Sequence, residues 1–224
     1  MTLSDSGPDS GSTSGPGSGP APEPTPAEAL RAAVAYYDAH AEAFHAQTAD
    51  LDLEHVYTRF LPLVPPGGAI LDAGCGAGRD ARRLAARGYR VEAFDASPAM
   101  VRLARAHAGV PVRVLDFAAM DYPPRFHGVL ANASLLHLPP AALPGALAGV
   151  ARALLPGGVL CAGLKRGSGH WLRQGLPFWA YGEATLAALL APPCPLRLLE
   201  TWTSPDLRPG RAGEVWLHCL ARKP

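Results

Sequence analysis

Short apolar runs alternate with helical patterns between residues 69 and 164. Strands covered by helices on both faces read as continuous apolar runs, and strands that alternate with helices pair in parallel. Two later apolar runs are joined by a loop alone, which predicts an antiparallel finish. The pattern therefore predicts an α/β fold with a doubly wound, mostly parallel seven-stranded sheet and an antiparallel last strand. The runs are AILDA, YRVEAFD, VRVLD, GVLANAS, GVLCAGL, LRLLETWT and EVWLHCLARK.

The first residues of the chain differ in composition from the rest. Residues 1–26 are rich in Gly, Ser, Pro and Thr and cannot bury enough apolar area to offset their ordering entropy. We predict a disordered tail there and one folded domain over residues 27–224. The domain opens with an apolar stripe at helical spacing, which predicts an N-terminal helix. The stripe consists of Leu30, Val34, Tyr37, Ala41 and Phe44.

Charge and cysteine content exclude several classes of protein. The 20 basic and 19 acidic residues nearly balance, so no overall field attracts nucleic acid. The four cysteines lack the spacing of a metal site or a disulfide framework. No apolar run approaches the roughly 18 residues of a membrane span, and the start lacks the order of a secretory signal. We expect a cytoplasmic protein without metal, whose partner is neither nucleic acid nor membrane; the oligomeric state stays open.

A glycine-rich turn follows the first strand run, in ILDAGCGAGRD. Gly74, Gly76 and Gly78 allow a tight turn and a close approach to a ligand, and the following helix offers unpaired N–H groups. A dinucleotide loop needs a further glycine where Arg79 stands, and a triphosphate loop ends in Gly-Lys-Ser or Gly-Lys-Thr. Both nucleotide classes are disfavoured.

Two further acids close the next two strand runs. Asp95 ends the second run, and Asp116 ends the third with Phe117 beside it. Because parallel strands end at one edge of a sheet, these side chains should meet near the glycine turn. A carboxylate at Asp95 can accept from both hydroxyls of a ribose, and one at Asp116 can accept from an adenine amine. The pattern predicts an adenosine site that needs no phosphate.

In this order the motifs resemble those of class I S-adenosylmethionine-dependent methyltransferases, from about residue 36 to the C-terminus. The resemblance implies a Rossmann-like sheet, an N-terminal helical lid and S-adenosyl-L-methionine as cofactor. It also implies in-line methyl transfer to a small-molecule acceptor. The motifs are ILDAGCGAG, VEAFDAS, VLDF, GVLANASLLHL and ALLPGGVL; YYD, GRD and SPDLRPGRAGEVW resemble the methyltransferase type 11 or tellurite-resistance-like subgroup, which adds an oxyanion such as tellurite as a candidate acceptor.

The resemblance also implies which residues contact the cofactor. The glycine turn would wall the methionine part, with Asp72 bonded through water or loop amides. A tyrosine hydroxyl of the lid, Tyr37 first and Tyr36 second, would reach the methionine carboxylate. The implied set is Tyr36, Tyr37, Asp72, Gly74, Cys75, Gly76, Gly78, Arg79, Asp95, Ala96, Asp116, Phe117 and Ala133.

Several residues can be interpreted either as site residues or as purely structural ones. Tyr37 lies on the helical stripe and could equally be core. His137 is our candidate catalytic residue, since a histidine can act as a base near neutral pH, but it could also cap or pack. The aromatic residues after Lys165 either wall a substrate cavity or bury themselves in a loop. They are Trp171, Phe178, Trp179 and Tyr181.

The activity itself also has alternatives. The NASL stretch lacks the Asn-Pro-Pro-aromatic motif that holds a nucleobase amine, which disfavours nucleobase methylation. A protein that binds S-adenosylmethionine without transferring its methyl group, as a regulator or scaffold, is the alternative to an enzyme. A nicotinamide oxidoreductase is disfavoured by Arg79.

Overall fold

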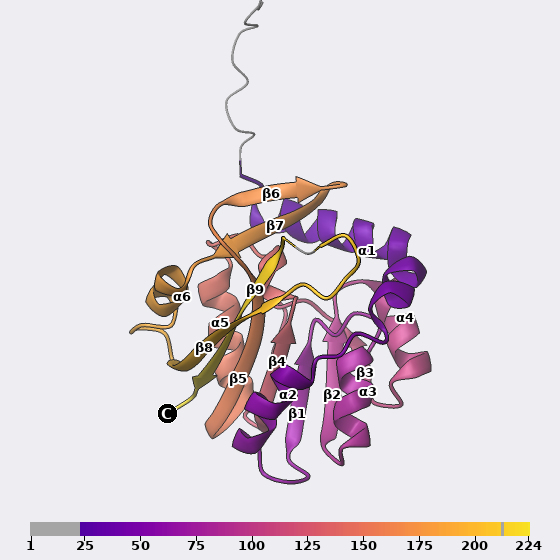
Figure 1. The fold of residues 1–224 in the computed structure, drawn as a ribbon. Coiled ribbons are helices and arrows are strands. Elements are labelled where there is room, and N and C mark those ends of the chain that lie inside the picture. Colours follow the sequence, from indigo (N-terminus) through magenta and orange to yellow (C-terminus); the bar gives the residue numbers. More distant parts are fainter. Residues whose placement is uncertain (1–22, 212) are drawn as a thin grey trace, which may run out of the picture.

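The computed structural model describes residues 23–211 and 213–224, and the tail predicted over residues 1–26 lies outside them up to residue 22. Within these residues a central sheet has helices on both sides (Figure 1). Its strands are β1 (Ala69–Ala73), β2 (Arg90–Asp95), β3 (Val112–Val114), β4 (Phe126–Asn132), β5 (Leu154–Arg166), β6 (His170–Arg173), β7 (Leu176–Tyr181), β8 (Arg197–Pro205) and β9 (Val215–Arg222). The helices are α1 (Pro26–Thr48), α2 (Glu54–Phe60), α3 (Arg79–Ala86), α4 (Pro98–His107), α5 (Leu143–Ala153) and α6 (Glu183–Leu189), with short 3₁₀ helices η1 (Leu61–Leu63) and η2 (Leu135–His137).

The strand order confirms the predicted fold class. Strands β3, β2, β1, β4 and β5 lie side by side in parallel. The last strand, β9, pairs antiparallel with β5 and also carries β8 on its other edge. The chain runs from β1 to β2 on one side and from β4 to β5 on the other. The boundary between β1 and β4 is therefore the point at which the strand order reverses, where open α/β sheets bind ligands.

All seven predicted runs are strands of the sheet, and β6 and β7 form an additional hairpin. The hairpin joins the sheet only at the end of β5, where Lys165 pairs with Ala180 and Arg166 with Tyr181. Its turn places Gln174 at φ 52° and Gly175 at φ 80°. Two consecutive left-handed residues suit a two-residue hairpin turn. The stretch that we expected to be an aromatic loop is therefore a pair of strands above the edge of the sheet (Figure 1).

The core has two parts, one on each face of the sheet. Ile70 of β1 packs with the helices α2, α3 and α4, whereas its neighbour Leu71 packs with α5 on the opposite face. Successive strand residues point to opposite faces, so the continuous apolar runs serve both layers. Among the described residues, no helix combines the length and apolar character that crossing a membrane requires.

Helix α1 lies across the edge at which the parallel strands end (Figure 1). It begins with a capping box between Thr25 and Glu28. Trp179 of β7 donates to Glu23 at 2.7 Å near its start. Farther along, Asp38 accepts from the Ser97 hydroxyl at 2.6 Å, at the beginning of α4. The predicted N-terminal helix is confirmed, and side chains of its apolar stripe face a cavity instead of solid core.

Candidate functional site

A cavity of about 540 Å³ lies between α1 and the carboxyl ends of the strands. This volume is typical of small-molecule sites. One half of its wall comes from the turns after β1, β2 and β3. The other half comes from η2, the β6–β7 hairpin and the loop between β8 and β9. The two halves meet at the end of β4.

All but two of the predicted site residues line this cavity. Those that line it are Tyr36, Tyr37, Gly74, Cys75, Gly76, Arg79, Asp95, Ala96, Asp116, Phe117, Ala133 and His137. The exceptions are Asp72, which we expected to act through water or loop amides, and Gly78, which we expected at the wall.

The three glycines of the turn have different surroundings. All are left-handed, with φ of 74° at Gly74, 53° at Gly76 and 83° at Gly78. A Cβ on Gly78 would stand 2.9 Å from the Cβ of Ala108, so this glycine allows the turn to pack on α4 and does not face the ligand space. At Gly76 the nearest atom would be a Phe44 ring carbon 3.8 Å away. Only Gly74 and Gly76 line the cavity.

Asp72 points beneath α3 and not into the cavity, because residues of a strand alternate between its faces. Its side chain is buried, and within the described residues its Oδ2 has no hydrogen-bond partner. Burial, reinforced by the nearby charge of Asp80, raises the pKa of Asp72 well above its usual range. Burial thus disfavours the charged form of this acid.

The Asp80 carboxylate, in contrast, is fully supported by donors. The Arg79 guanidinium grips it through Nε at 2.9 Å and Nη2 at 2.8 Å. Tyr57 donates its hydroxyl, and the Asn132 amide donates at 3.1 Å. Burial alone would raise the pKa of Asp80, but the Arg79 charge and these hydrogen bonds hold it at about 2. Arg79 is thus engaged by a carboxylate of the protein, although it lines the cavity.

Asp95 connects the end of β2 to the glycine turn. Its Oδ2 accepts from the Gly76 N–H at 2.8 Å and its Oδ1 from the Ser97 N–H at 2.9 Å. Each carboxylate oxygen has two acceptor sites, so one remains on each oxygen for a ligand. Burial raises the pKa of Asp95, and the backbone donors oppose that rise. The side chain is an oriented acceptor for two adjacent donors.

The next strand end supplies an aromatic wall. Asp116 accepts from the Ala119 N–H at 2.8 Å, which fixes its carboxylate after β3. The Phe117 ring packs edge-on against Phe94, with centroids 5.3 Å apart. An acid and an aromatic ring therefore stand beside Asp95, as the sequence predicts.

The end of β4 is rigidly held between the two halves of the cavity. Ser134 donates its hydroxyl to the Ala73 carbonyl at 2.7 Å. Ala133 has φ of 62°, a left-handed conformation that costs a non-glycine residue about 1–2 kcal/mol. Strain of this kind concentrates at functional sites. It turns the backbone of Ala133 into the cavity wall.

Tyr37 and His137 form a hydrogen-bonded pair at the centre of the cavity. The Tyr37 hydroxyl lies 2.9 Å from His137 Nε2, and His137 Nδ1 lies 2.8 Å from the Pro177 carbonyl oxygen. Because a carbonyl only accepts, Nδ1 carries the proton and Nε2 accepts from Tyr37. Burial lowers the pKa of His137 to about 4. The imidazole is neutral at pH 7, with its acceptor nitrogen at the ligand space.

The aromatic residues of the hairpin divide into two groups. Only Phe178 lines the cavity, and Trp171 stacks on it with centroids 5.4 Å apart. Trp179 holds the start of α1 through Glu23, and Tyr181 is buried and donates to the Leu138 carbonyl at 3.4 Å. One ring therefore walls the cavity and the others support the structure around it.

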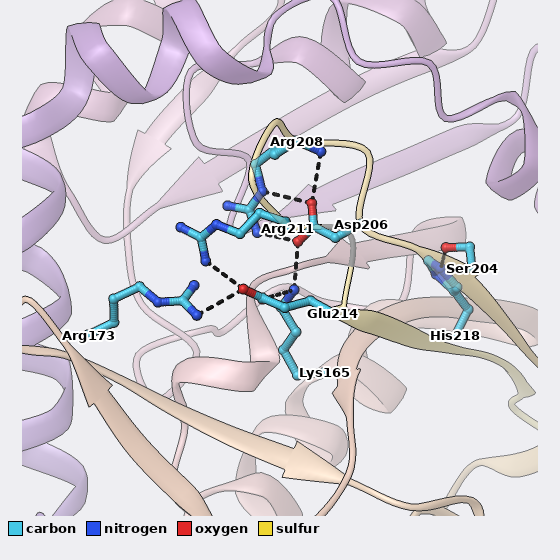
Figure 2. A network of polar contacts seen from close by, with 8 residues as sticks. All are labelled: Lys165, Arg173, Ser204, Asp206, Arg208, Arg211, Glu214 and His218. Atoms are coloured by element: carbon cyan, nitrogen blue, oxygen red, sulfur yellow. Dashed lines mark hydrogen bonds and ion pairs between the residues drawn. The ribbon is translucent and has the colours of Figure 1, made fainter.

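The sequence interpretation missed a charged cluster in the second half of the cavity (Figure 2). Lys165 donates to Asp206 at 2.7 Å and forms an ion pair with Glu214 at 2.7 Å. Arg208 pairs with Asp206, while Arg173 and Arg211 pair with Glu214. The residues lie on β5, β6 and the β8–β9 loop, so no local spacing predicts them; the only signal was the density of charge in SPDLRPGRAGE.

A second polar pair, Ser204 and His218, lies to one side of the charged cluster (Figure 2). Ser204 Oγ is 2.9 Å from His218 Nε2, and both residues line the cavity. Burial lowers the pKa of His218 to about 3, which favours a neutral ring. Over the part of the chain that the structure describes, no three His, Cys, Asp or Glu side chains group so as to hold a metal ion.

Sequence comparisons match the first half of this site. Residues 70–158 match a family model described as a methyltransferase domain. Ubiquinone biosynthesis O-methyltransferase of Xanthomonas campestris pv. campestris (strain B100) is 34% identical over 103 residues, 42% of this chain and 42% of that protein. The enzyme of the same name from Methylocella silvestris is 50% identical over 50 residues, 22% and 20% of the two chains. The matches span less than half the length of these relatives.

Solved structures match most of the chain. The 1,6-didemethyltoxoflavin-N1-methyltransferase of Burkholderia thailandensis, solved with its substrate and S-adenosylhomocysteine, has a TM-score of 0.76 at 24% identity over 91% of this chain and 92% of that one. A TehB-like S-adenosylmethionine-dependent methyltransferase from Corynebacterium glutamicum has a TM-score of 0.62 at 24% identity over 85% and 99%. The [4+2]-cyclase SpnF has a TM-score of 0.69 at 18% identity over 91% and 98%. At these identities the likeness shows the fold.

Proposed function

We propose that this chain, in which residues 70–158 belong to the methyltransferase-domain family, transfers a methyl group from S-adenosylmethionine to a small organic acceptor. The observation that carries the proposal is a single cavity with two different ends. Asp95, Asp116 and Phe117 line one end, and the other end continues past Tyr37 and His137 beneath the hairpin. One cavity thus has room for a donor and an acceptor side by side.

The residues of the first half fit an adenosine without phosphate. Asp95 keeps one acceptor site on each oxygen for the two hydroxyls of a ribose. Asp116 and Phe117 offer an acceptor and a ring face to the base, and bare Gly76 leaves space for the methionine part. Arg79, the cation nearest the turn, is already paired with Asp80. When bound, S-adenosylmethionine supplies a methyl group that is activated as a sulfonium.

The protein then has to position an acceptor and exclude water. Proximity and orientation can supply roughly 7–11 kcal/mol, more than the roughly 3–5 kcal/mol that correspond to the 10²–10⁴-fold effect of a general base. The lid and hairpin cover the site, and a proton can reach His137 Nε2 through the Tyr37 hydroxyl that is hydrogen-bonded to it. Because burial lowers the pKa of His137 to about 4, the imidazole is a weak base. It suits an acidic or already ionised hydroxyl, in line with the O-methyltransferase names of the curated relatives.

The wall around the acceptor end favours an organic molecule. Leu176, Phe178 and Trp216 line it together with the charged cluster. A bare oxyanion such as tellurite would use the charges but leave the apolar surface unfilled. We keep tellurite as the second candidate acceptor because the cluster carries excess positive charge.

Calorimetry with S-adenosylhomocysteine tests the cofactor part of the proposal. Asp95→Ala should weaken binding roughly 10²–10⁴-fold, because each of its two charged hydrogen bonds to a diol contributes about 1.5–3 kcal/mol. Asp121→Ala removes an exposed acid outside the cavity and should leave the affinity unchanged. Circular dichroism of both variants checks that the fold persists. Absence of binding to the unaltered protein would refute the proposal.

An acceptor screen tests the transfer itself, with formation of S-adenosylhomocysteine as the readout. The panel contains phenols, enols, heteroaromatic amines and tellurite. Methylation of an organic hydroxyl supports our assignment, and methylation of tellurite alone supports the second candidate. Tight cofactor binding without turnover of any acceptor would favour the binding protein without transfer activity, since a shared fold does not fix the reaction.

A further inference from the structure

The charged cluster at the acceptor end carries a net positive charge. Its members are four cations, Lys165, Arg173, Arg208 and Arg211, and two carboxylates, Asp206 and Glu214. Burial alone would raise the pKa of Asp206, but Arg208 and Lys165 hold it at about 2. The Lys165 and Arg211 partners likewise lower the pKa of Glu214 against the effect of burial. Both acids are ionised at neutral pH, which leaves an excess of two positive charges.

Side-chain exposure differs across the cluster: Lys165 and Asp206 are buried, and two of the arginines are partly exposed. The side chains of Lys165 and Asp206 are 3% and 2% exposed. Lys165 also lies 3.9 Å from the centroid of the Trp216 ring. The side chains of Arg173 and Arg211 are 34% and 26% exposed and line the cavity. The buried Lys165–Asp206 pair stabilises the β8–β9 loop, and the guanidinium groups of Arg173 and Arg211 lie at the cavity.

These guanidinium groups have donors to spare. An arginine offers five N–H donors. Arg173 uses Nη2 and Arg211 uses Nη1, both toward Glu214 Oε1, as Figure 2 shows. Within the described residues neither makes another hydrogen bond. The guanidinium groups of Arg173 and Arg211 therefore both bind Glu214 beside the cavity and keep unused N–H donors.

Apolar surface surrounds this charge. Leu176, Phe178, Leu207 and Trp216 line the same end of the cavity. Unbalanced charge beside apolar surface is costly unless a counter-charge accompanies it. The charge also reaches the centre of the site, because Arg208 opposes the burial that raises the pKa of Tyr37. The cluster and the Tyr37–His137 pair can thus act on one molecule.

We infer that the methyl acceptor is an anion, an apolar or aromatic body with a carboxylate or phosphate group that Arg173 and Arg211 bind while the body lies against Phe178 and Trp216. This assignment deepens the proposed function and rests on it. Arginine suits both groups because its planar fork donates two parallel hydrogen bonds. The reactive hydroxyl of such an acceptor would extend toward His137.

The competing explanation is that the cluster has only a structural role, because Glu214 links β6 to the β8–β9 loop through its ion pairs with Arg173 and Arg211. The two explanations differ for Glu214→Gln. If the arginines serve a ligand, removing the carboxylate releases both forks and strengthens anion binding. If they serve only the loop, the same change loosens the wall and weakens every acceptor.

The test uses calorimetry on the full chain with S-adenosylhomocysteine present. The probes are 3,4-dihydroxybenzoate against its neutral amide, and phenyl phosphate against phenol; the two anions distinguish a carboxylate from a phosphate acceptor. We expect at least one anion to bind about tenfold or more tightly than its neutral match. Arg173→Gln with Arg211→Gln should remove that preference, and Glu214→Gln should increase it. Arg166→Gln, which breaks a surface ion pair with Glu183 outside the cavity, is the matched control and should change nothing.

Equal affinity for each anion and its neutral match would overturn the inference. So would a Glu214→Gln variant that binds anion and neutral match equally weakly while its thermal unfolding is unchanged. A separate titration of the same protein with S-adenosylhomocysteine alone reports cofactor binding. Failure of the cofactor to bind refutes the proposed function, whereas cofactor binding without anion preference refutes only the acceptor class.

Discussion

Alanine at Gly74 should mainly lower the stability of the fold, whereas alanine at Gly76 should mainly weaken cofactor binding. At Gly74, φ of 74° costs roughly 1–2 kcal/mol for any side chain. The new Cβ would also stand 2.4 Å from the Cβ of Ser134, and overpacking of this kind costs roughly 1–3 kcal/mol. Gly74→Ala should therefore destabilise the fold by about 2–5 kcal/mol, or roughly 5–15 °C in Tm for a chain of this size.

At Gly76 the strain is present but the clash is not. The nearest atom to its new Cβ would be 3.8 Å away, so Gly76→Ala should cost only about 1–2 kcal/mol of stability. Its methyl group would occupy the ligand side of the turn and weaken S-adenosylhomocysteine binding. Thermal unfolding and calorimetry on both variants measure the two effects separately.

A second substitution identifies the source of the Gly74 effect. Ser134→Gly removes the clashing Cβ, so the double variant should recover the roughly 1–3 kcal/mol of overpacking but not the cost of the backbone conformation. Equal stability of Gly74→Ala and Gly76→Ala would refute the reasoning. So would unchanged cofactor affinity in Gly76→Ala.

Two further predictions concern buried charge. Burial lowers the pKa of His137 from about 6.5 to about 4. As the pH falls, the unfolded chain therefore binds this proton before the folded chain does. The free energy of unfolding should decline by about 3 kcal/mol between pH 6.5 and pH 4. Urea unfolding of His137→Gln should lack that share of the decline, and identical pH profiles would contradict the burial argument. Lys165→Met should destabilise the fold by about 3 kcal/mol, the lower end for breaking a buried pair, since Arg208 still accompanies Asp206. A loss under about 1 kcal/mol in chemical denaturation would mean that the ammonium is dispensable there.

The first half of the site could be predicted from sequence because its signals are local. Asp95 and Asp116 end apolar strand runs, and the topology of parallel strands then brings them to one edge. Asp72 shows the limit of this reasoning. It belongs to the same motif, but alternation along β1 turns it under α3, and the same rule could have been applied beforehand.

The second half could not be predicted, because its residues are brought together only by tertiary structure. Tyr37 and His137 are 100 positions apart and pair through a lid whose docking no local pattern specifies. The hairpin was missed because its turn places Gln174 in a left-handed conformation, where Asn or Gly is the usual signal. Without the hairpin, Arg173 has no predicted relation to Glu214.

The cavity takes its wall from inside and from outside the segment that matches the family model. The family match covers residues 70–158 and stops before the chain reaches Arg173 or the β8–β9 loop. In the proposed function, the ribose and adenine contacts therefore lie within the matched segment, whereas the arginines proposed to bind the acceptor lie beyond it. On that proposal, substitutions in the β8–β9 loop should alter acceptor preference, while Asp95 and its turn keep the methyl donor bound. For the same reason, an engineer could exchange the loop and hairpin as a cassette and retain the methyl donor.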